Sequence, residues 1–247
     1  MKPVHGLCLV LVVGVVWSCL PVMGQGAGQA DRSAAEIQKA LDLQRINFKF
    51  EGNMVIWQAL GGQADIPLRR VIRELRPLCT VNIVYYPIPE EDIPINVDLR
   101  DLTLRQALDT ICKAGKHDMD FDVIQGAVVV ADRPTLIILR NKKPALPANP
   151  TPEETEAIAK LDAKVDVRCE DTKMQDACEY LAGLAKVSII ATLPREGENF
   201  PNVNLILARV TLGQALFHLT GLKYNYGVFG PQIVVSDDVG LALRRVK

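Results

Sequence analysis

Side chains that could do acid, base or metal chemistry are few in this chain of 247 residues. Two of its three histidines, His117 and His218, lie beyond the first 24 residues. Neither has a cysteine or a carboxylate at the spacing that is typical of zinc ligands. His117 is expected to be solvated at a turn, and His218 to be an exposed or half-buried structural residue of a helix. The sequence therefore predicts no metal site and no cofactor.

Carboxylates occur in three groups, at residues 90–92, at Asp120 with Asp122, and at residues 237–238. Paired carboxylates can act as a general acid and a general base. The first group lies in a loop flanked by prolines, and Asp120 and Asp122 alternate with apolar Phe121, which predicts a solvated strand face. No nucleophile elbow or phosphate-binding loop is present. We predict no catalytic residue, with a hydrolase that uses an unrecognised carboxylate pair as an alternative.

Four cysteines remain once the first 24 residues are removed, and none of them forms a Cys-x-x-Cys pair. They are Cys79, Cys112, Cys169 and Cys178. Their pairing cannot be chosen from sequence. A disulfide between Cys169 and Cys178 is one option, and the favoured interpretation is that both are small apolar core residues.

The composition indicates a folded protein that does not bind nucleic acid through a broad positive field. Hydrophobic residues make up 49% and charged residues 23% of the chain, as in globular proteins. Lys and Arg number 28 against 29 Asp and Glu, which gives a formal net charge of −1. We expect no nucleic-acid partner.

Residues 1–24 resemble a secretory signal peptide. Lys2 supplies the positive start, an apolar run over residues 7–17 follows, and small residues come next. We expect cleavage near Gly24, followed by a disordered segment over residues 25–33. Lipidation at Cys19 is the alternative, disfavoured because Trp17 stands where a lipoprotein signal has a small residue. The protein is therefore predicted to be exported, without a transmembrane span after removal of the signal.

An internal repeat organises the rest of the chain. Residues 103–108 (TLRQAL) recur as residues 211–216 (TLGQAL), an offset of 211 − 103 = 108. Alternating strand-like segments flank both copies, and helical apolar periods precede them. Each copy reads as helix, strand, helix, strand, strand, helix, strand, strand. The sequence predicts an α+β protein of two small tandem domains, residues 34–140 and 153–247, each with two main helices on short sheets.

Three predicted helix starts carry the spacing of a capping box, in which a hydroxyl and an amide side chain bond to free backbone N–H groups. They are Thr103 with Gln106, Thr172 with Gln175, and Thr211 with Gln214.

Five further segments carry expectations. Residues 141–152 are a Pro-rich linker of extended character. Residues 135–139 could be an additional edge strand of the first domain. An insertion after Gly52 contains Trp57, which either completes a core or forms a contact patch. The closing strands, residues 128–131 and 233–236, could present open edges to an extended partner segment.

These motifs resemble a known family. VNIVYYP (residues 81–87), INVDLRDLTLRQALDTI (95–111) and VVVAD (128–132) are similar to the secretin and TonB short N-terminal domain, or STN domain. The second copy, with VSIIATLP (187–194), TGLKY (220–224) and IVVSD (233–237), is similar as well. The resemblance implies a small α+β module that works by protein–protein contact in the periplasm and has no catalytic residues.

We therefore expect a non-enzymatic interaction or scaffold module of the periplasm or cell envelope, with an envelope protein as partner and self-association as a further option. The alternative is a carrier of a small ligand or glycan that uses the groove between the domains.

Overall fold

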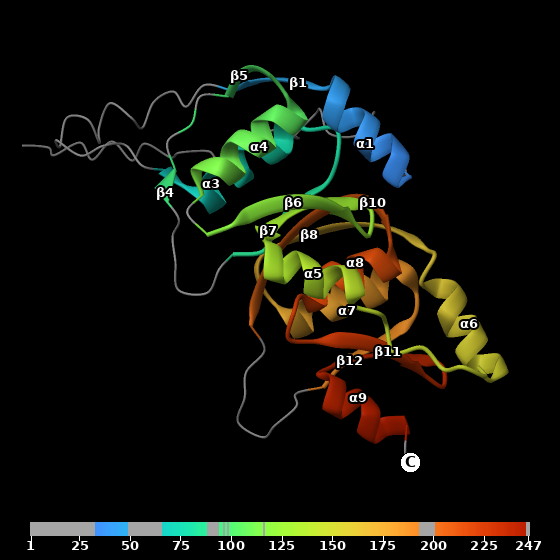
Figure 1. The fold of residues 1–247 in the computed structure, drawn as a ribbon. Helices are drawn as coiled ribbons and strands as arrows, with labels where there is room; N and C mark the ends of the chain where they lie inside the picture. Colours follow the sequence, from blue (N-terminus) through green and yellow to red (C-terminus); the bar gives the residue numbers. More distant parts are fainter. Residues whose placement is uncertain are drawn as a thin grey trace, which may run out of the picture.

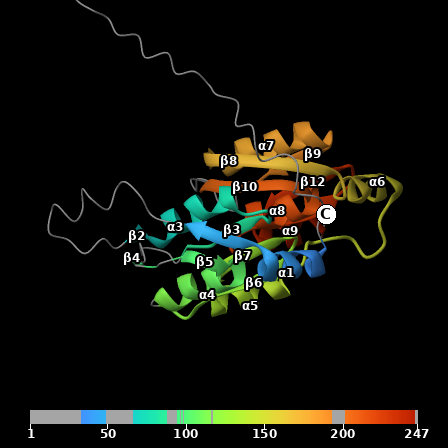
Figure 2. The same ribbon diagram turned by 90° about the horizontal axis from the view of Figure 1, so that it is seen from above.

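The computed structural model of this protein describes residues 33–48, 66–87, 94–95, 97, 99–115, 117–192 and 201–245. The predicted signal peptide, the acidic group at residues 90–92 and the insertion with Trp57 lie outside these ranges. We call residues 33–141 the first half and residues 142–245 the second half. Figures 1 and 2 show the two halves in contact with each other.

The first half alternates helices and short strands. In chain order its elements are α1 (Ala34–Leu43), β1 (Arg45–Phe48), β2 (Ile66–Pro67), α3 (Leu68–Leu75), a 3₁₀ turn (Arg76–Leu78), β3 (Ile83–Tyr85), β4 (Pro94–Ile95), β5 (Leu99–Thr103), α4 (Leu104–Ala114), β6 (Met119–Ile124), β7 (Ala127–Asp132) and α5 (Arg133–Asn141).

The second half repeats this order with longer strands at its start. Its elements are α6 (Pro152–Lys160), β8 (Lys164–Lys173), α7 (Met174–Ala185), β9 (Ser188–Ala191), β10 (Asn202–Thr211), α8 (Leu212–Thr220), β11 (Asn225–Phe229), β12 (Gln232–Ser236) and α9 (Asp238–Arg245). The α+β class predicted from sequence is confirmed.

The strands pair in the same way in both halves. A three-stranded sheet has the order β3-β7-β6 in the first half and β9-β12-β11 in the second. In each sheet the middle strand is parallel to the first strand and antiparallel to the last. An antiparallel ribbon accompanies each sheet, β1 with β5 and β8 with β10. The strands β7 and β12 are central, so the prediction that residues 128–131 and 233–236 form open edges is wrong. Sequence periodicity does not specify which strand of a sheet lies at its edge.

Two of the three predicted capping boxes are present. The hydroxyls of Thr103 and Thr211 accept the N3 backbone N–H of α4 and α8, and the N3 glutamines bond back to the cap residues. The box predicted at Thr172 is wrong. Thr172 pairs with Val203 within the β8–β10 ribbon, and its hydroxyl donates to the carbonyl of Glu170. The long ribbon extends strand β8 past the hydroxyl that would have capped α7.

The edge strand predicted for residues 135–139 is also wrong, because this segment lies within helix α5. The carboxylate of Asp132 accepts the N–H of Thr135, and Pro134 stands in the first turn, where its missing N–H costs nothing. Leu136 and Leu139 point into the core, as the helical period requires.

Both faces of the central strand β7 are buried. Val128 and Val130 of β7 belong to the core of the first half, together with residues of α1, α3 and α4. Val129 and Ala131, on the opposite face, belong to a second core that also contains residues of α7 and α8. Leu216 of α8 is part of that core. Packing therefore joins the two halves through the central strand β7.

The predicted linker packs on strand β11. Ala145 forms a parallel bridge with Gly227 of β11, and its N–H donates to the carbonyl of Tyr226 at 2.8 Å. Leu146 packs against the core that the halves share. Within the described ranges, no helix is long and apolar enough to span a membrane.

Candidate functional site

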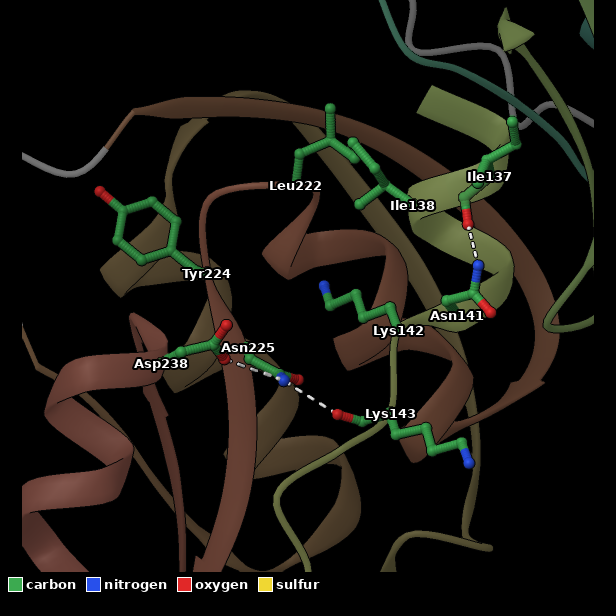
Figure 3. A pocket seen from close by; sticks show the side chains of 9 residues that line it. All are labelled: Ile137, Ile138, Asn141, Lys142, Lys143, Leu222, Tyr224, Asn225 and Asp238. Carbon is green, nitrogen blue, oxygen red and sulfur yellow. Dashed lines mark hydrogen bonds between the residues drawn. The ribbon is translucent and has the colours of Figure 1, made fainter. Parts of the chain in front are cut away.

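A cavity of about 560 Å³ opens where the end of α5 meets the second half. Its lining combines residues that are far apart in the chain (Figure 3). These residues are Ile137, Ile138, Asn141, Lys142, Lys143, Leu222, Tyr224, Asn225 and Asp238. The cavity is therefore a product of the way in which the two halves pack.

One part of the cavity rim is apolar and exposed. Ile137 and Ile138 are 56% and 53% exposed, and Leu222 is 46% exposed. The two isoleucines lie on the outward face of α5, because Leu136 and Leu139 occupy its buried face. We name Ile137, Ile138 and Leu222 the junction patch. An apolar group of this kind beside a concavity is typical of a surface that binds a partner or a ligand.

The other part of the lining is polar and held in place by hydrogen bonds. The amide of Asn225 donates to the carbonyl of Lys143 at 2.9 Å and to a carboxylate oxygen of Asp238 at 3.3 Å. The amide of Asn141 donates to the carbonyl of Ile137 at 2.8 Å. The two bonds of Asn225 join β11 to the segment that follows α5 and to α9.

Lys142 is the residue that follows α5, and its side chain reaches the C-terminal end of α8. Its Nζ donates to the hydroxyl of Thr220 at 2.8 Å and to the carbonyl of Gly221 at 2.5 Å, with the carbonyl of Phe217 at 3.4 Å. It also lies 5.0 Å from the centre of the Phe217 ring. Burial lowers the pKa of Lys142 to about 7, and the Asp238 carboxylate partly opposes this shift.

A lysine with a lowered pKa in a cavity could serve as a nucleophile or a base. The surroundings of Lys142 favour a structural role instead. Three oxygen acceptors match the three N–H groups of an ammonium ion, and a cation at a helix C-terminus is favoured by the helix dipole. Lys142 therefore joins the end of α5 to the end of α8.

His218 is buried, so the prediction of an exposed or half-buried histidine is wrong. It is 5% exposed and lies between the halves. Its Nδ1 is 3.3 Å from the hydroxyl of Tyr86, and its Nε2 is 3.2 Å from the carbonyl of Gln125. Burial lowers the pKa of His218 to about 4, and the nearby Lys142 adds to this shift. The expected structural role is consistent with these contacts, which hold a neutral ring at the junction.

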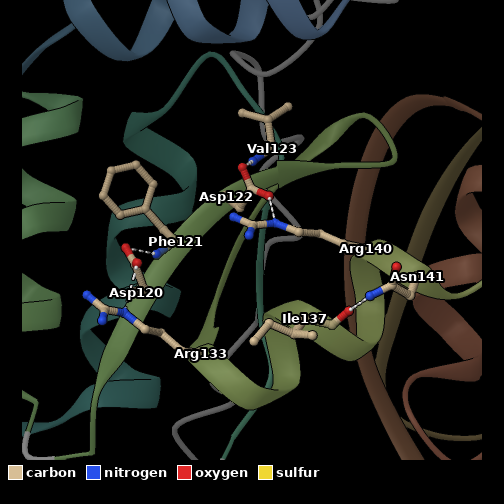
Figure 4. A network of polar contacts seen from close by, with 8 residues as sticks. All are labelled: Asp120, Phe121, Asp122, Val123, Arg133, Ile137, Arg140 and Asn141. Atoms are coloured by element: carbon tan, nitrogen blue, oxygen red, sulfur yellow. Dashed lines mark hydrogen bonds and ion pairs between the residues drawn. The ribbon is translucent and has the colours of Figure 1, made fainter.

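Asp120 and Asp122 project from β6 toward helix α5 (Figure 4). Arg140 donates to Asp122 at 2.6 Å, and the Nε of Arg133 is 3.4 Å from Asp120. The two carboxylates also accept the N–H groups of the residues that follow them, at 2.9 Å and 2.8 Å. These contacts favour a structural role for the pair over general acid and base catalysis.

The remaining candidates are dispersed. His117 is exposed at a turn, as expected. Asp237 accepts the N–H of Gly240 and so caps α9, while Asp238 lines the cavity. The described part of the chain contains no group of three or more His, Cys, Asp or Glu residues that could hold a metal ion.

All four described cysteines are buried and none forms a disulfide, so the Cys169–Cys178 disulfide is absent and the core interpretation is confirmed. Burial raises the pKa of Cys79, Cys112 and Cys178 to about 12, and raises that of Cys169. A thiol with a raised pKa supplies little thiolate near neutral pH, so these side chains are poor nucleophiles.

Sequence reasoning missed both the cavity and the junction patch. Ile137 and Ile138 were assigned to a strand, and Leu222 was read only as part of a family-like segment. A helical period over residues 133–141 would instead have predicted that the two isoleucines lie on the solvent-exposed face of a helix. Their proximity to Leu222 is a tertiary contact without a local signal.

Comparison of the chain with protein-family models, with curated proteins and with solved structures finds no match.

Proposed function

We propose that this protein is a non-enzymatic interaction module of the cell envelope, exported by its N-terminal signal and bound to a partner protein at the junction of its two halves. The export part of the proposal rests on residues 1–24, and the interaction part is supported by the resemblance to STN domains. The junction patch is the observation that carries the proposal.

Three large aliphatic side chains, each about half exposed, border one concavity in the junction patch. The polar groups that complete the lining hold the surface rigid, because Lys142 and Asn225 bond the segments that form it. A rigid apolar patch with polar groups at its margin has the composition of a protein-binding surface, in which apolar anchors supply affinity and the rim supplies register.

Crosslinking and mass spectrometry in native envelopes test this proposal. We expect crosslinks from Lys143 to recur on one partner protein. An Ile138→Asp variant should lose them, because a charge in the centre of the patch resists desolvation. Leu43→Asp on α1 is the matched control, since Leu43 is 67% exposed and lies outside the patch. Equal crosslinking of the wild type, Ile138→Asp and Leu43→Asp would overturn the proposal.

A second candidate function is supported by the cavity itself. A volume of about 560 Å³ is within the range of small-ligand sites, and Lys143, Asn225 and Asp238 offer polar groups to a small molecule or glycan. A ligand that raises the melting temperature of the wild type, and not that of Asp238→Ala, would favour this carrier function over the partner protein.

The third alternative, a hydrolase that uses Asp120 and Asp122, has the weakest support because both carboxylates already accept backbone and guanidinium donors. It would require a measured activity that Asp122→Asn abolishes without unfolding the protein.

A further inference from the structure

The two three-stranded sheets have four outer edges, formed by β3, β6, β9 and β11. An edge strand carries unpaired N–H and C=O groups and is a template for a further strand, so folded proteins usually block their edges. The repeated architecture allows each edge to be compared with its equivalent in the other half.

The edge of β6 is blocked by its own side chains. In the β6–β7 hairpin, the residues next to the two-residue turn exchange hydrogen bonds, so the N–H groups of Phe121 and Val123 point away from β7. The carboxylates of Asp120 and Asp122 accept these two N–H groups at 2.9 Å and 2.8 Å. These carboxylates therefore occupy the groups that another strand would use.

The edge of β11 is also blocked by a side chain that accepts the N–H of the next residue, and in addition by a neighbouring segment. The outward N–H of Tyr226 donates to the side-chain oxygen of Asn225 at 2.9 Å. The outward carbonyl of Tyr226 accepts the N–H of Ala145 at 2.8 Å. Residues just after α5 thus cover this edge.

The edge of β3 is blocked by Arg76 and by the second half. The Nε of Arg76 donates to the outward carbonyl of Ile83 at 2.9 Å. Just before the strand, the side chain of Asn82 forms two hydrogen bonds with the backbone of Ala208, at 3.0 Å and 2.9 Å.

The edge of β9 differs from these three. Thr192 donates its N–H to Val235 of β12, so the N–H and C=O groups of Ile189 and Ala191 point away from the sheet. Residue 189 corresponds to residue 83, an offset of 189 − 83 = 106, which places Ala182 at the position of Arg76. A methyl group cannot donate to the carbonyl of Ile189. No residue that the structure describes bonds to the outer side of β9.

Cations flank this uncapped edge. Lys186 is exposed two residues before β9, and Arg244 of α9 bonds to the hydroxyl of Thr192 directly after it, at 3.1 Å. We propose that the edge of β9 binds an extended segment of a partner protein, which adds a strand to the sheet β9-β12-β11 and carries acidic residues at its ends. The inference deepens the proposed function and rests on it, because it names a second contact for the same kind of partner.

A peptide titration tests the edge without knowledge of the native partner. The probe is a seven-residue peptide of alternating valine and threonine with a glutamate at each end, and its control has lysine at each end. Amide hydrogen exchange is measured on the full-length chain. We expect about tenfold slower exchange at Ile189 and Ala191 with the glutamate peptide, and less with the lysine peptide.

Two variants of one residue separate edge pairing from folding. Ala191→Pro removes the outward N–H and is tolerated at a strand edge, so it should abolish the protection. Ala191→Ser keeps the N–H and should retain it. Ile190→Asp reproduces the arrangement at Asp120, because its carboxylate could accept the N–H of Ala191. This variant should also weaken binding of the glutamate peptide.

The outcomes separate this inference from the proposed function. Protection absent at saturating peptide, or unchanged in Ala191→Pro, overturns the edge site. Self-association of the wild type that Ala191→Pro abolishes overturns it in favour of a second copy. If protection occurs as expected but native envelopes yield no partner crosslinks, the edge site stands and the proposed function fails.

Discussion

Burial of His218 lowers its pKa from 6.5 to about 4, so this side chain ties the stability of the fold to pH. Between these values the unfolded chain binds a proton that the folded chain does not bind. The contribution of the neutral ring to stability is therefore complete above pH 6.5, falls as the pH is lowered through this window, and stops falling below about pH 4.

From this shift we expect the free energy of unfolding to be about 2 kcal/mol lower at pH 5 than at pH 7.5. Urea titrations at several pH values measure it. His218→Gln, which has no titratable ring, should lose this part of the pH dependence. An identical pH profile for the wild type and His218→Gln would contradict the assignment.

Gly126 offers a second test on a single residue. Its φ is +74°, and a Cβ there would lie 2.7 Å from Nε2 of Gln214, the capping-box residue of α8. Gly126→Ala should therefore destabilise the protein by about 1–2 kcal/mol through backbone strain and a displaced cap. Thermal unfolding measures the change.

Gly183→Ala is the matched control for that substitution. Gly183 lies inside α7, and a Cβ there would meet nothing within 4 Å. Alanine is a better helix former than glycine, so this variant should be more stable by about 0.5–1 kcal/mol. If both variants shift the midpoint in the same direction, the close approach of the β6–β7 turn to α8 is not as described.

Capping boxes provide the test at the scale of elements. Thr211 accepts the N–H of Gln214 at 3.1 Å, whereas Thr172 has the same sequence spacing and makes no such bond. Thr211→Ala should lower the free energy of unfolding by about 1 kcal/mol. Thr172→Ala should change it by less than about 0.5 kcal/mol. Denaturant midpoints with unchanged slopes distinguish the two, and equal losses would contradict the observed helix starts.

Local signals predicted most elements of the fold. Helices α4 and α8 begin where the capping boxes at Thr103 and Thr211 predict, and residues 128–131 and 233–236 lie within strands as predicted. These elements predicted the α+β class. They could be predicted because hydrophobic periodicity and helix caps each depend on only a few neighbouring residues. The run at residues 135–139 failed because five consecutive β-branched or aliphatic residues fit a strand as well as a helix, and the deciding cap, Asp132, lies outside the run.

The candidate surfaces were harder to predict from sequence than the helices and strands. The junction patch joins α5 to Leu222, about 85 residues later in the chain. Its formation depends on which face of β7 is shared between the halves, and neither period nor caps specify this. The order of strands within a sheet could not be predicted for the same reason. Strands β7 and β12 come last among the strands of their halves in the sequence, yet they lie at the centre of their sheets.

The shared core makes a prediction for the whole molecule. Val129 is fully buried among side chains that include those of α7 and α8, whereas Val128 and Val130 face the core of the first half. Neither half can unfold without exposing one face of β7. We therefore expect one cooperative transition, with equal calorimetric and van't Hoff enthalpies.

Val129→Ala tests that coupling, because it removes two methyl groups at the contact between the halves. It should lower the free energy of unfolding by about 2 kcal/mol, whereas Ile138→Ala, at an exposed position, should change it by less than about 0.5 kcal/mol. Native-state hydrogen exchange gives the decisive measurement. If the halves unfold together, the slowest amides of α4 and of α8 lose protection by the same amount in Val129→Ala. Loss confined to α8, or a second calorimetric transition, would mean that each half is stable alone and that the junction is a weak contact between independent domains.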